Sequence, residues 1–176
     1  MNVSDQVGDI SVASEFFAKL NHKNFDAVIT ISSTRAVPFI IPESSAKQLV
    51  LTFDDAEGFG GAKLASLDHI NQAIDFAREV RDQSLLVHCG AGERRSPAVA
   101  LAIIADRLGP GCEKEAVDYL YSNFSDIEPN ARIVEIADMA LGRDGVLAGC
   151  FYSYKDLHAE RLSYEAHRRS KRLRWR

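Results

Sequence analysis

The sequence predicts an α/β fold: a central, mostly parallel sheet of about four to five strands flanked by helices. Short apolar runs of strand length, rich in β-branched residues, occur at 25–31, 48–53 and 85–88. Stretches with helical spacing of apolar residues separate or follow them. Because a strand, a helix and a second strand in succession normally give parallel strands, the order of these segments favours a parallel sheet.

Each segment has a local reason for its assignment. Residues 1–8 are polar, and we expect them to be ragged. Ile10 begins a short strand or turn, which a helix over 14–20 follows. The segment 64–81 is amphipathic with helical spacing. Gly109-Pro110-Gly111 ends a later helix, the one that follows Cys89. Further helices are expected over 113–124 and over 133–141, the second ended by Gly142.

The chain is organised around residues 85–104. An apolar run of buried-strand length leads to Cys89, and a loop with two glycines follows it. Ser96-Pro97 then lies in the first turn of an alanine- and isoleucine-rich helix, where proline is tolerated. Cys89 is therefore expected at the carboxyl end of a strand, where α/β folds place their ligand sites.

This placement favours binding of a tetrahedral anion. A helix start offers unpaired N–H groups and the positive end of the helix dipole. Gly90 and Gly92 let successive amides surround one anion, and the same cradle favours a thiolate at Cys89. The planar guanidinium of Arg95 can hold two phosphate oxygens, and Ser96 can donate to the sulfur as it leaves phosphorus. A structural cysteine beside a turn would not require this Arg-Ser pair.

The segment resembles the signature of the cysteine-dependent protein tyrosine phosphatase superfamily: His-Cys, five residues, Arg and then Ser or Thr. Here these are His88-Cys89 and Arg95-Ser96, and the Ala91-Gly92 pair also matches. The resemblance implies a phosphotyrosine protein phosphatase-like fold, with Cys89 as the nucleophile of a phosphocysteine mechanism that needs no cofactor and no metal. The implied substrate is phosphotyrosine in proteins, with phosphoserine and phosphothreonine as further candidates.

The layout is similar to the dual-specificity branch of that superfamily, in which a strand ends in an acidic loop ahead of the helix that precedes the cysteine. By this resemblance the general acid is Asp55, with Asp54 as the alternative. The glycines of 58–61 are expected to be hinges of a lid, and Phe59 either stacks on an aryl phosphate or packs in the core. Asn130 either supports the cysteine loop or simply starts a helix.

The expected phosphate-binding set departs from the family at Glu93, where apolar or aromatic residues are common. An inward carboxylate would repel a dianionic ester, whereas an outward one could pair with Arg94 or another cation. Phosphoinositide phosphatases of the superfamily carry basic residues where Gly90 and Glu93 stand, which argues against highly charged inositol lipids. His88 either orients loop carbonyls or is a core histidine. The set comprises Gly90, Ala91, Gly92, Glu93, Arg94, His88 and Asp54.

The 176 residues suit one catalytic domain, placed at 1–150, followed by a basic, helical tail at 151–176. No apolar run reaches membrane-spanning length, and no secretory signal is recognisable. Three widely spaced cysteines and a thiolate nucleophile indicate the cytoplasm. Cys112 and Cys150 are expected to be plain thiols, with a disulfide from one of them to Cys89 as the alternative.

Charge is unevenly distributed. From Arg161 onward the tail carries seven basic residues and one acid, a net charge of +6, so residues 1–160 carry −10 of the total −4. The tail is either a solvated helix or a contact for an acidic partner. Two other functions therefore stay open: an RNA 5′-triphosphatase, in which the tail would contact nucleic acid, and a phosphate-binding module without turnover. The acidic body makes nucleic acid the weaker interpretation.

Overall fold

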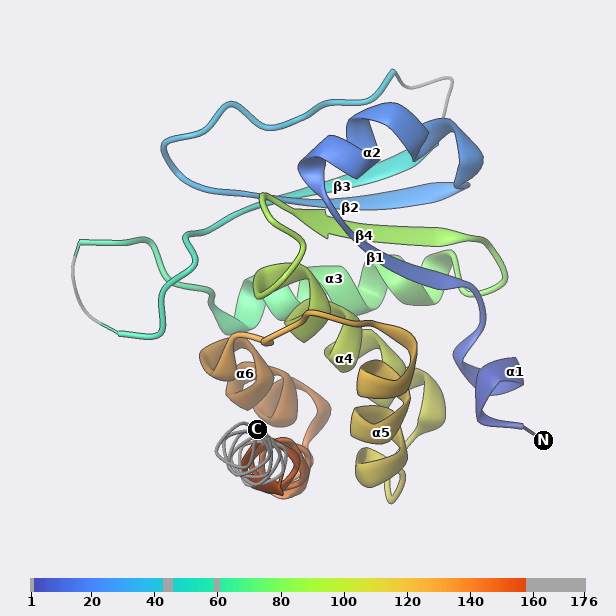
Figure 1. Cartoon of the computed structure of the whole chain (residues 1–176), viewed down its shortest axis with the longest axis vertical. Helices are drawn as coiled ribbons and strands as arrows, with labels where there is room; N and C mark the ends of the chain where they lie inside the picture. Colours follow the sequence, from blue (N-terminus) through green and yellow to red (C-terminus); the bar gives the residue numbers. More distant parts are fainter. Residues whose placement is uncertain (1, 43–45, 59–60, 158–176) are drawn as a thin grey trace, which may run out of the picture.

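The computed structural model describes residues 2–42, 46–58 and 61–157 (Figure 1). Within these ranges four strands form one parallel sheet in the order β1-β4-β2-β3. The strands are β1 (Ile10–Ser14), β2 (Ala27–Ser32), β3 (Lys47–Thr52) and β4 (Leu85–Cys89). The predicted α/β architecture with a parallel sheet is confirmed.

Helices cover both faces of the sheet. Figure 1 shows α2 on one face and α3 to α6 on the other. The helices are α1 (Val3–Val7), α2 (Glu15–Asn21), the 3-10 helix η1 (His22–Asn24), α3 (Leu67–Glu79), α4 (Arg95–Leu108), α5 (Glu113–Asn123), α6 (Ala131–Leu141) and a helix over 146–157. None of the helices in these ranges is long and apolar enough to cross a membrane.

The apolar run of β4 packs against both layers. Side chains alternate along a strand, so Leu85 and Val87 join the large core with α3 and α4, whereas Leu86 joins the smaller core beneath α2. All five residues of β4 are buried. Cys89 at its end is thus carried by a strand that is buried along its whole length.

Helix α4 fixes the other end of the loop. It is almost entirely buried, and it packs against β4, β1, α1, α3, α5 and α6. Its alanines allow this close approach on every side, and its isoleucines fill the space between the neighbouring helices. A helix held this way gives the loop a rigid start for the phosphate-binding chemistry that the sequence predicts.

The amino-terminal segment differs from the sequence prediction. Residues 3–7 form α1, and Val7 is fully buried in the main core. The guanidinium of Arg107, near the end of α4, donates to the carbonyl oxygens of Val7 and Ala77. The expectation of a ragged start is therefore wrong, because one apolar side chain and one buried arginine hold the segment against the body.

The expected boundary after residue 150 falls inside the helix over 146–157. Phe151 is fully buried, and Tyr154 stacks on Tyr121 of α5 with ring centroids 4.1 Å apart. This helix therefore packs on the body at least as far as Tyr154. The basic stretch that begins at Arg161 lies outside the described residues.

Candidate active site

The segment 90–94 joins the carboxyl end of β4 to the start of α4, as the sequence predicts. We call residues 89–96 the catalytic loop, after the role that we propose for it. Strand β1 lies beside β4 in register, with Ser14 opposite Cys89. The loop therefore rests on the carboxyl edge of the sheet, between β1 and the acidic segment that follows β3.

Carbonyl groups of the catalytic loop are bonded to neighbouring segments. Gly90 O accepts from Glu15 N (3.1 Å), Glu93 O accepts from Glu128 N (2.8 Å), and Arg94 O accepts from Asn130 N (3.0 Å). In a trans peptide the N–H of the following residue points opposite to the C=O. The amides of residues 91, 94 and 95 therefore point away from these neighbours, toward the inside of the loop, where they can surround an anion.

Gly92 is required by a close backbone approach. Its φ is +85°, and a Cβ there would lie 2.6 Å from the carbonyl carbon of Ala13 and 2.7 Å from the nitrogen of Ser14. The loop is thus packed directly onto the end of β1, with no room for a side chain. Gly92 N also points at Cys89 Sγ, at 3.4 Å.

Cys89 lies at the base of the loop with 3% of its surface exposed. Its sulfur is 3.2 Å from the hydroxyl of Ser96, which is itself fully buried in the first turn of α4. Together with Gly92 N this gives the sulfur two potential donors and the start of a helix beside it. This is the environment in which a thiolate is stabilised by hydrogen bonds and the helix dipole.

Arg95 is a buried cation that forms no ion pair in the described parts of the chain, although its charge interacts with that of Asp54. It is 7% exposed, and its Nη1 donates to the carbonyl oxygen of Phe53 at the end of β3 (3.0 Å). Its Nε is buried and has no hydrogen-bond partner there, and Nη2 lies beside Gly90, 3.6 Å from where a Cβ would be. A buried guanidinium that is unpaired on one edge favours an anionic ligand at the loop.

The two candidate acids have different surroundings. The carboxylate of Asp54 accepts from Thr34 N (2.9 Å), from Thr34 Oγ1 and from Lys63 N (2.9 Å). The backbone and hydroxyl bonds from Thr34, followed by the bond from Lys63, lower the pKa of Asp54. Asp54 thereby joins the loop after β2 to the chain near residue 63, and its carboxylate oxygens are occupied.

Asp55 faces the catalytic loop instead. Its Oδ1 accepts from Asn130 Nδ2 (2.9 Å) and from Arg94 Nε (3.3 Å). Within residues 2–42, 46–58 and 61–157, no group donates a hydrogen bond to its Oδ2. One oxygen is therefore held in place, while the other has no hydrogen-bond partner among the described residues.

Asn130 supports the catalytic loop, one of the two roles that the sequence leaves open. It is fully buried, and its Oδ1 accepts from Ile133 N at the start of α6 (3.2 Å). Its backbone N–H holds Arg94 O, and its amide nitrogen holds Asp55. One residue therefore links the start of α6, the catalytic loop and the acidic segment.

Arg94 does not pair with Glu93, which corrects one expectation. Its guanidinium contacts Asp55 (3.3 Å), Glu57 (2.5 Å) and Glu128 (3.4 Å). Burial would lower the pKa of Arg94, but these carboxylates outweigh it and raise that pKa. Neither Glu57 nor Glu128 stands out in the sequence, because the two are far apart along the chain and meet only in the fold.

His88 is a sheet histidine. Its Nε2 lies 2.8 Å from Thr30 Oγ1, directly opposite on β2, and Gln48 Nε2 donates to the same hydroxyl (2.8 Å). The ring is 1% exposed, and burial lowers the pKa of His88 to about 4. His88 is therefore a core histidine, and its contact with Thr30 joins β4 to β2 beneath the loop.

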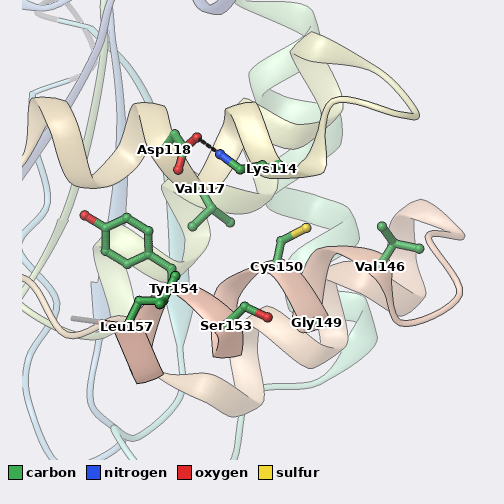
Figure 2. A pocket seen from close by; sticks show the side chains of 9 residues that line it. All are labelled: Lys114, Val117, Asp118, Val146, Gly149, Cys150, Ser153, Tyr154 and Leu157. Carbon is green, nitrogen blue, oxygen red and sulfur yellow. Dashed lines mark hydrogen bonds and ion pairs between the residues drawn. The ribbon is translucent and has the colours of Figure 1, made fainter. Parts of the chain in front are cut away.

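The other cysteines lie far from Cys89. Cys112 follows the carboxyl end of α4, whose 14 residues span about 21 Å. Cys150 lines a groove with Lys114 and Val117 at the start of α5 (Figure 2), at that same distant end. A disulfide needs Cα atoms within about 7 Å, so the alternative of a bond from either residue to Cys89 is wrong.

Phe59, which is weighed above as a stacking residue, lies outside the described residues, as does Gly60 of the expected hinge. The part of the acidic segment that carries Asp54, Asp55 and Glu57 is described, and it lies against the catalytic loop.

Together, the strand-loop-helix, the parallel sheet and the acidic segment define the fold of the dual-specificity-like branch of the protein tyrosine phosphatases. Solved structures with this fold include Tk-PTP in its active form, with a TM-score of 0.60, 17% identity, and coverage of 81% of this chain and 95% of that one. DUSP15 gives a TM-score of 0.57 at 16% identity, covering 87% and 94% respectively.

A third neighbour is the human tyrosine phosphatase-like serine/threonine/tyrosine-interacting protein, with a TM-score of 0.53 at 20% identity over 78% of this chain and 92% of that one. No family model matches the sequence, and no curated protein matches it either. The likeness therefore shows the fold, and the chemistry has to be argued from the site.

We predict that Gly92→Ala destabilises the protein by more than about 2 kcal/mol, because an alanine at this φ is strained and its Cβ meets the backbone of β1. Gly90→Ala is the matched control: its Cβ would make only an ordinary contact, and we expect a change within about 0.5 kcal/mol. Chemical denaturation of the two variants measures both values. Equal stabilities would contradict the close packing of the loop on β1.

We also predict that His88 makes stability depend on pH. The unfolded histidine titrates near its ordinary pKa of 6.5, and the buried one near 4, so the unfolded state binds the extra proton between these values. Stability is therefore full above pH 6.5 and falls by about 3 kcal/mol as the pH drops toward 4. The free energy of unfolding of the parent chain and of His88→Gln, followed over this range, should differ in slope; parallel curves would contradict the prediction.

Proposed function

We propose that the protein is a cysteine-dependent phosphatase that hydrolyses phosphotyrosine in proteins, with phosphoserine and phosphothreonine as further candidate substrates. The observation that carries the proposal is Arg95: a buried guanidinium that is unpaired on one edge within the described residues and lies over a cradle of amides around Cys89. A phosphate group supplies the missing negative charge and accepts from both the guanidinium and the amides.

In the proposed reaction, the Cys89 thiolate attacks phosphorus and forms a phosphocysteine, while the ester oxygen leaves. Arg95 and the loop amides bind the equatorial oxygens as charge develops on them. Ser96 lies 3.2 Å from the sulfur and can donate to it when water later displaces the thiolate from phosphorus. The same donor and Gly92 N hold the free thiolate between turnovers.

Asp55 is the proposed general acid. The bonds from Asn130 and Arg94 to its Oδ1 leave Oδ2 to hold the proton that the leaving oxygen receives. The resulting carboxylate then takes a proton from the attacking water. Asp54 is the weaker candidate, because three donor groups from two segments already bond to its oxygens and its pKa is lowered by those bonds.

Two other functions use the same fold. A binding module without turnover needs the phosphate cradle but neither the nucleophile nor an acid with a free oxygen, and the arrangement of Cys89, Ser96 and Asp55 favours catalysis over it. An RNA 5′-triphosphatase would depend on the basic tail beyond Arg161, which lies outside the described residues. The described surface beside the loop carries acids, which favours a substrate other than a polyanion.

We predict that Cys89→Ser lowers kcat/KM for a generic aryl phosphate by more than about 1,000-fold, because it removes the nucleophile. The variant should still bind inorganic phosphate, since Arg95 and the loop amides remain. Turnover is measured with a chelator present, so that a metal-dependent contaminant is excluded. Residual activity near the parent level would contradict the proposed mechanism.

A second prediction separates the two acids by leaving group. A poor leaving group such as phenol needs a proton, whereas dinitrophenol departs without one, so Asp55→Asn should slow phenyl phosphate roughly 100-fold and dinitrophenyl phosphate far less. Asp54→Asn should change both esters by the same factor, because its contacts are structural. The measurement is the ratio of kcat/KM for the two esters. A changed ratio in Asp54→Asn with an unchanged one in Asp55→Asn would reverse the assignment.

A further inference from the structure

A second hollow, which we call the flanking groove, lies beside the catalytic loop. It has a volume of about 440 Å³, and its walls come from four segments: the end of β1, the start of α2, loop residues 91–93 and residues 124–126 after α5. Because residues 91–93 belong to both the loop and the groove, a ligand whose phosphate occupies the loop can extend into the groove.

Among the described residues, two carboxylates and no cation line the flanking groove. Glu93 and Asp126 are both exposed. No ion pair or side-chain hydrogen bond found within residues 2–42, 46–58 and 61–157 involves either carboxylate. Arg94, the neighbour of Glu93 in the sequence, is engaged by Asp55, Glu57 and Glu128 instead. The charge of the groove is therefore not neutralised by this cation.

The remaining wall is largely apolar. Phe17 of α2 is 43% exposed although it is a large aromatic residue, and Phe124 and Val12 are half-buried against the core. An aromatic wall beside carboxylates suits a side chain that has an alkyl stem and a cationic end. Lysine and arginine are the protein side chains of this kind.

We propose that the flanking groove binds a lysine or arginine side chain of the substrate, within a few residues of the phosphorylated residue. An extended peptide advances about 3.5 Å per residue, so a near neighbour of the phosphorylated residue suffices to reach a groove that shares residues 91–93 with the loop. The proposal rests on the proposed phosphatase function and specifies its substrate class: phosphoproteins with a basic residue beside the phosphosite.

The test uses the full chain with Cys89→Ser, which binds without turnover. Dissociation constants are measured for three phosphotyrosine peptides that differ only in the flanking residues: arginine, alanine or glutamate. Partly exposed ion pairs contribute modestly, so we expect the arginine peptide to bind about fivefold more tightly than the alanine peptide, and the glutamate peptide to bind most weakly. The preference should shrink at high salt.

The groove variants are Asp126→Asn and Glu93→Gln, and the pair together should reduce the preference for arginine to near unity. Asparagine suits Asp126 because this residue has φ +56°, and asparagine tolerates that region. Asp144→Asn is the matched control: it removes the same charge at the same kind of backbone position (φ +51°), beyond the far end of α6. It should leave the preference unchanged.

Three results would overturn the proposal: equal affinities for the three peptides, a preference that survives in the double variant, or no binding of any phosphopeptide. A preference that emerges only after removal of residues 161–176 would also overturn it and assign the groove to the basic tail. Turnover of an aryl phosphate by the parent chain is a separate readout. An active enzyme without the preference refutes the groove alone, and a preference without turnover refutes the phosphatase function alone.

Discussion

The geometry of the site depends on one buried amide, that of Asn130. Its backbone N–H, side-chain nitrogen and side-chain oxygen bond to Arg94 O, Asp55 Oδ1 and Ile133 N respectively. An apolar replacement of similar size would keep the backbone bond to Arg94 O but remove both side-chain bonds, and the loss of a hydrogen bond by a buried group costs about 1–3 kcal/mol. Asn130 thus connects the acidic segment to the catalytic loop, so that the proposed acid and the proposed nucleophile are positioned together.

Charge around the loop is divided between two kinds of cation. Arg95 is buried and has an edge free for a ligand within the described residues, whereas Arg94 is saturated by three carboxylates. The two residues are adjacent in sequence, but Arg95 begins α4 and turns toward the end of β3, where Phe53 O receives it. Arg94 therefore serves the acidic segment, and a phosphate in the loop is left with Arg95 and the backbone amides.

Much of the fold could be predicted from local patterns. The runs predicted as strands at 25–31, 48–53 and 85–88 correspond to β2, β3 and β4, because their β-branched and apolar residues suit a buried sheet. Cys89 could be placed because strand, glycines and helix follow one another without a gap. Asp54 and Asp55 could not be separated this way. Asp54 is bonded to Thr34 and Lys63, whereas Asp55 is bonded to Asn130, and only the folded chain brings these partners to the two acids. The order of α1 depends likewise on Arg107, which lies 100 residues from Val7.

The balance of charge also bears on substrate selection. On one side of the loop Asp55, Glu57 and Glu128 all contact Arg94, and Glu128 also pairs with Lys155. On the other side Glu93 and Asp126 face the flanking groove without a cation from the described residues. A ligand with several phosphates would place its extra charges against these carboxylates, whereas the loop itself neutralises only one phosphate. A phosphorylated protein segment with a cationic side chain would instead be attracted by these carboxylates. In the proposed complex its phosphate is bound by Arg95 and the amides, and its cation approaches the carboxylates of Glu93 and Asp126 beside Phe17 and Phe124.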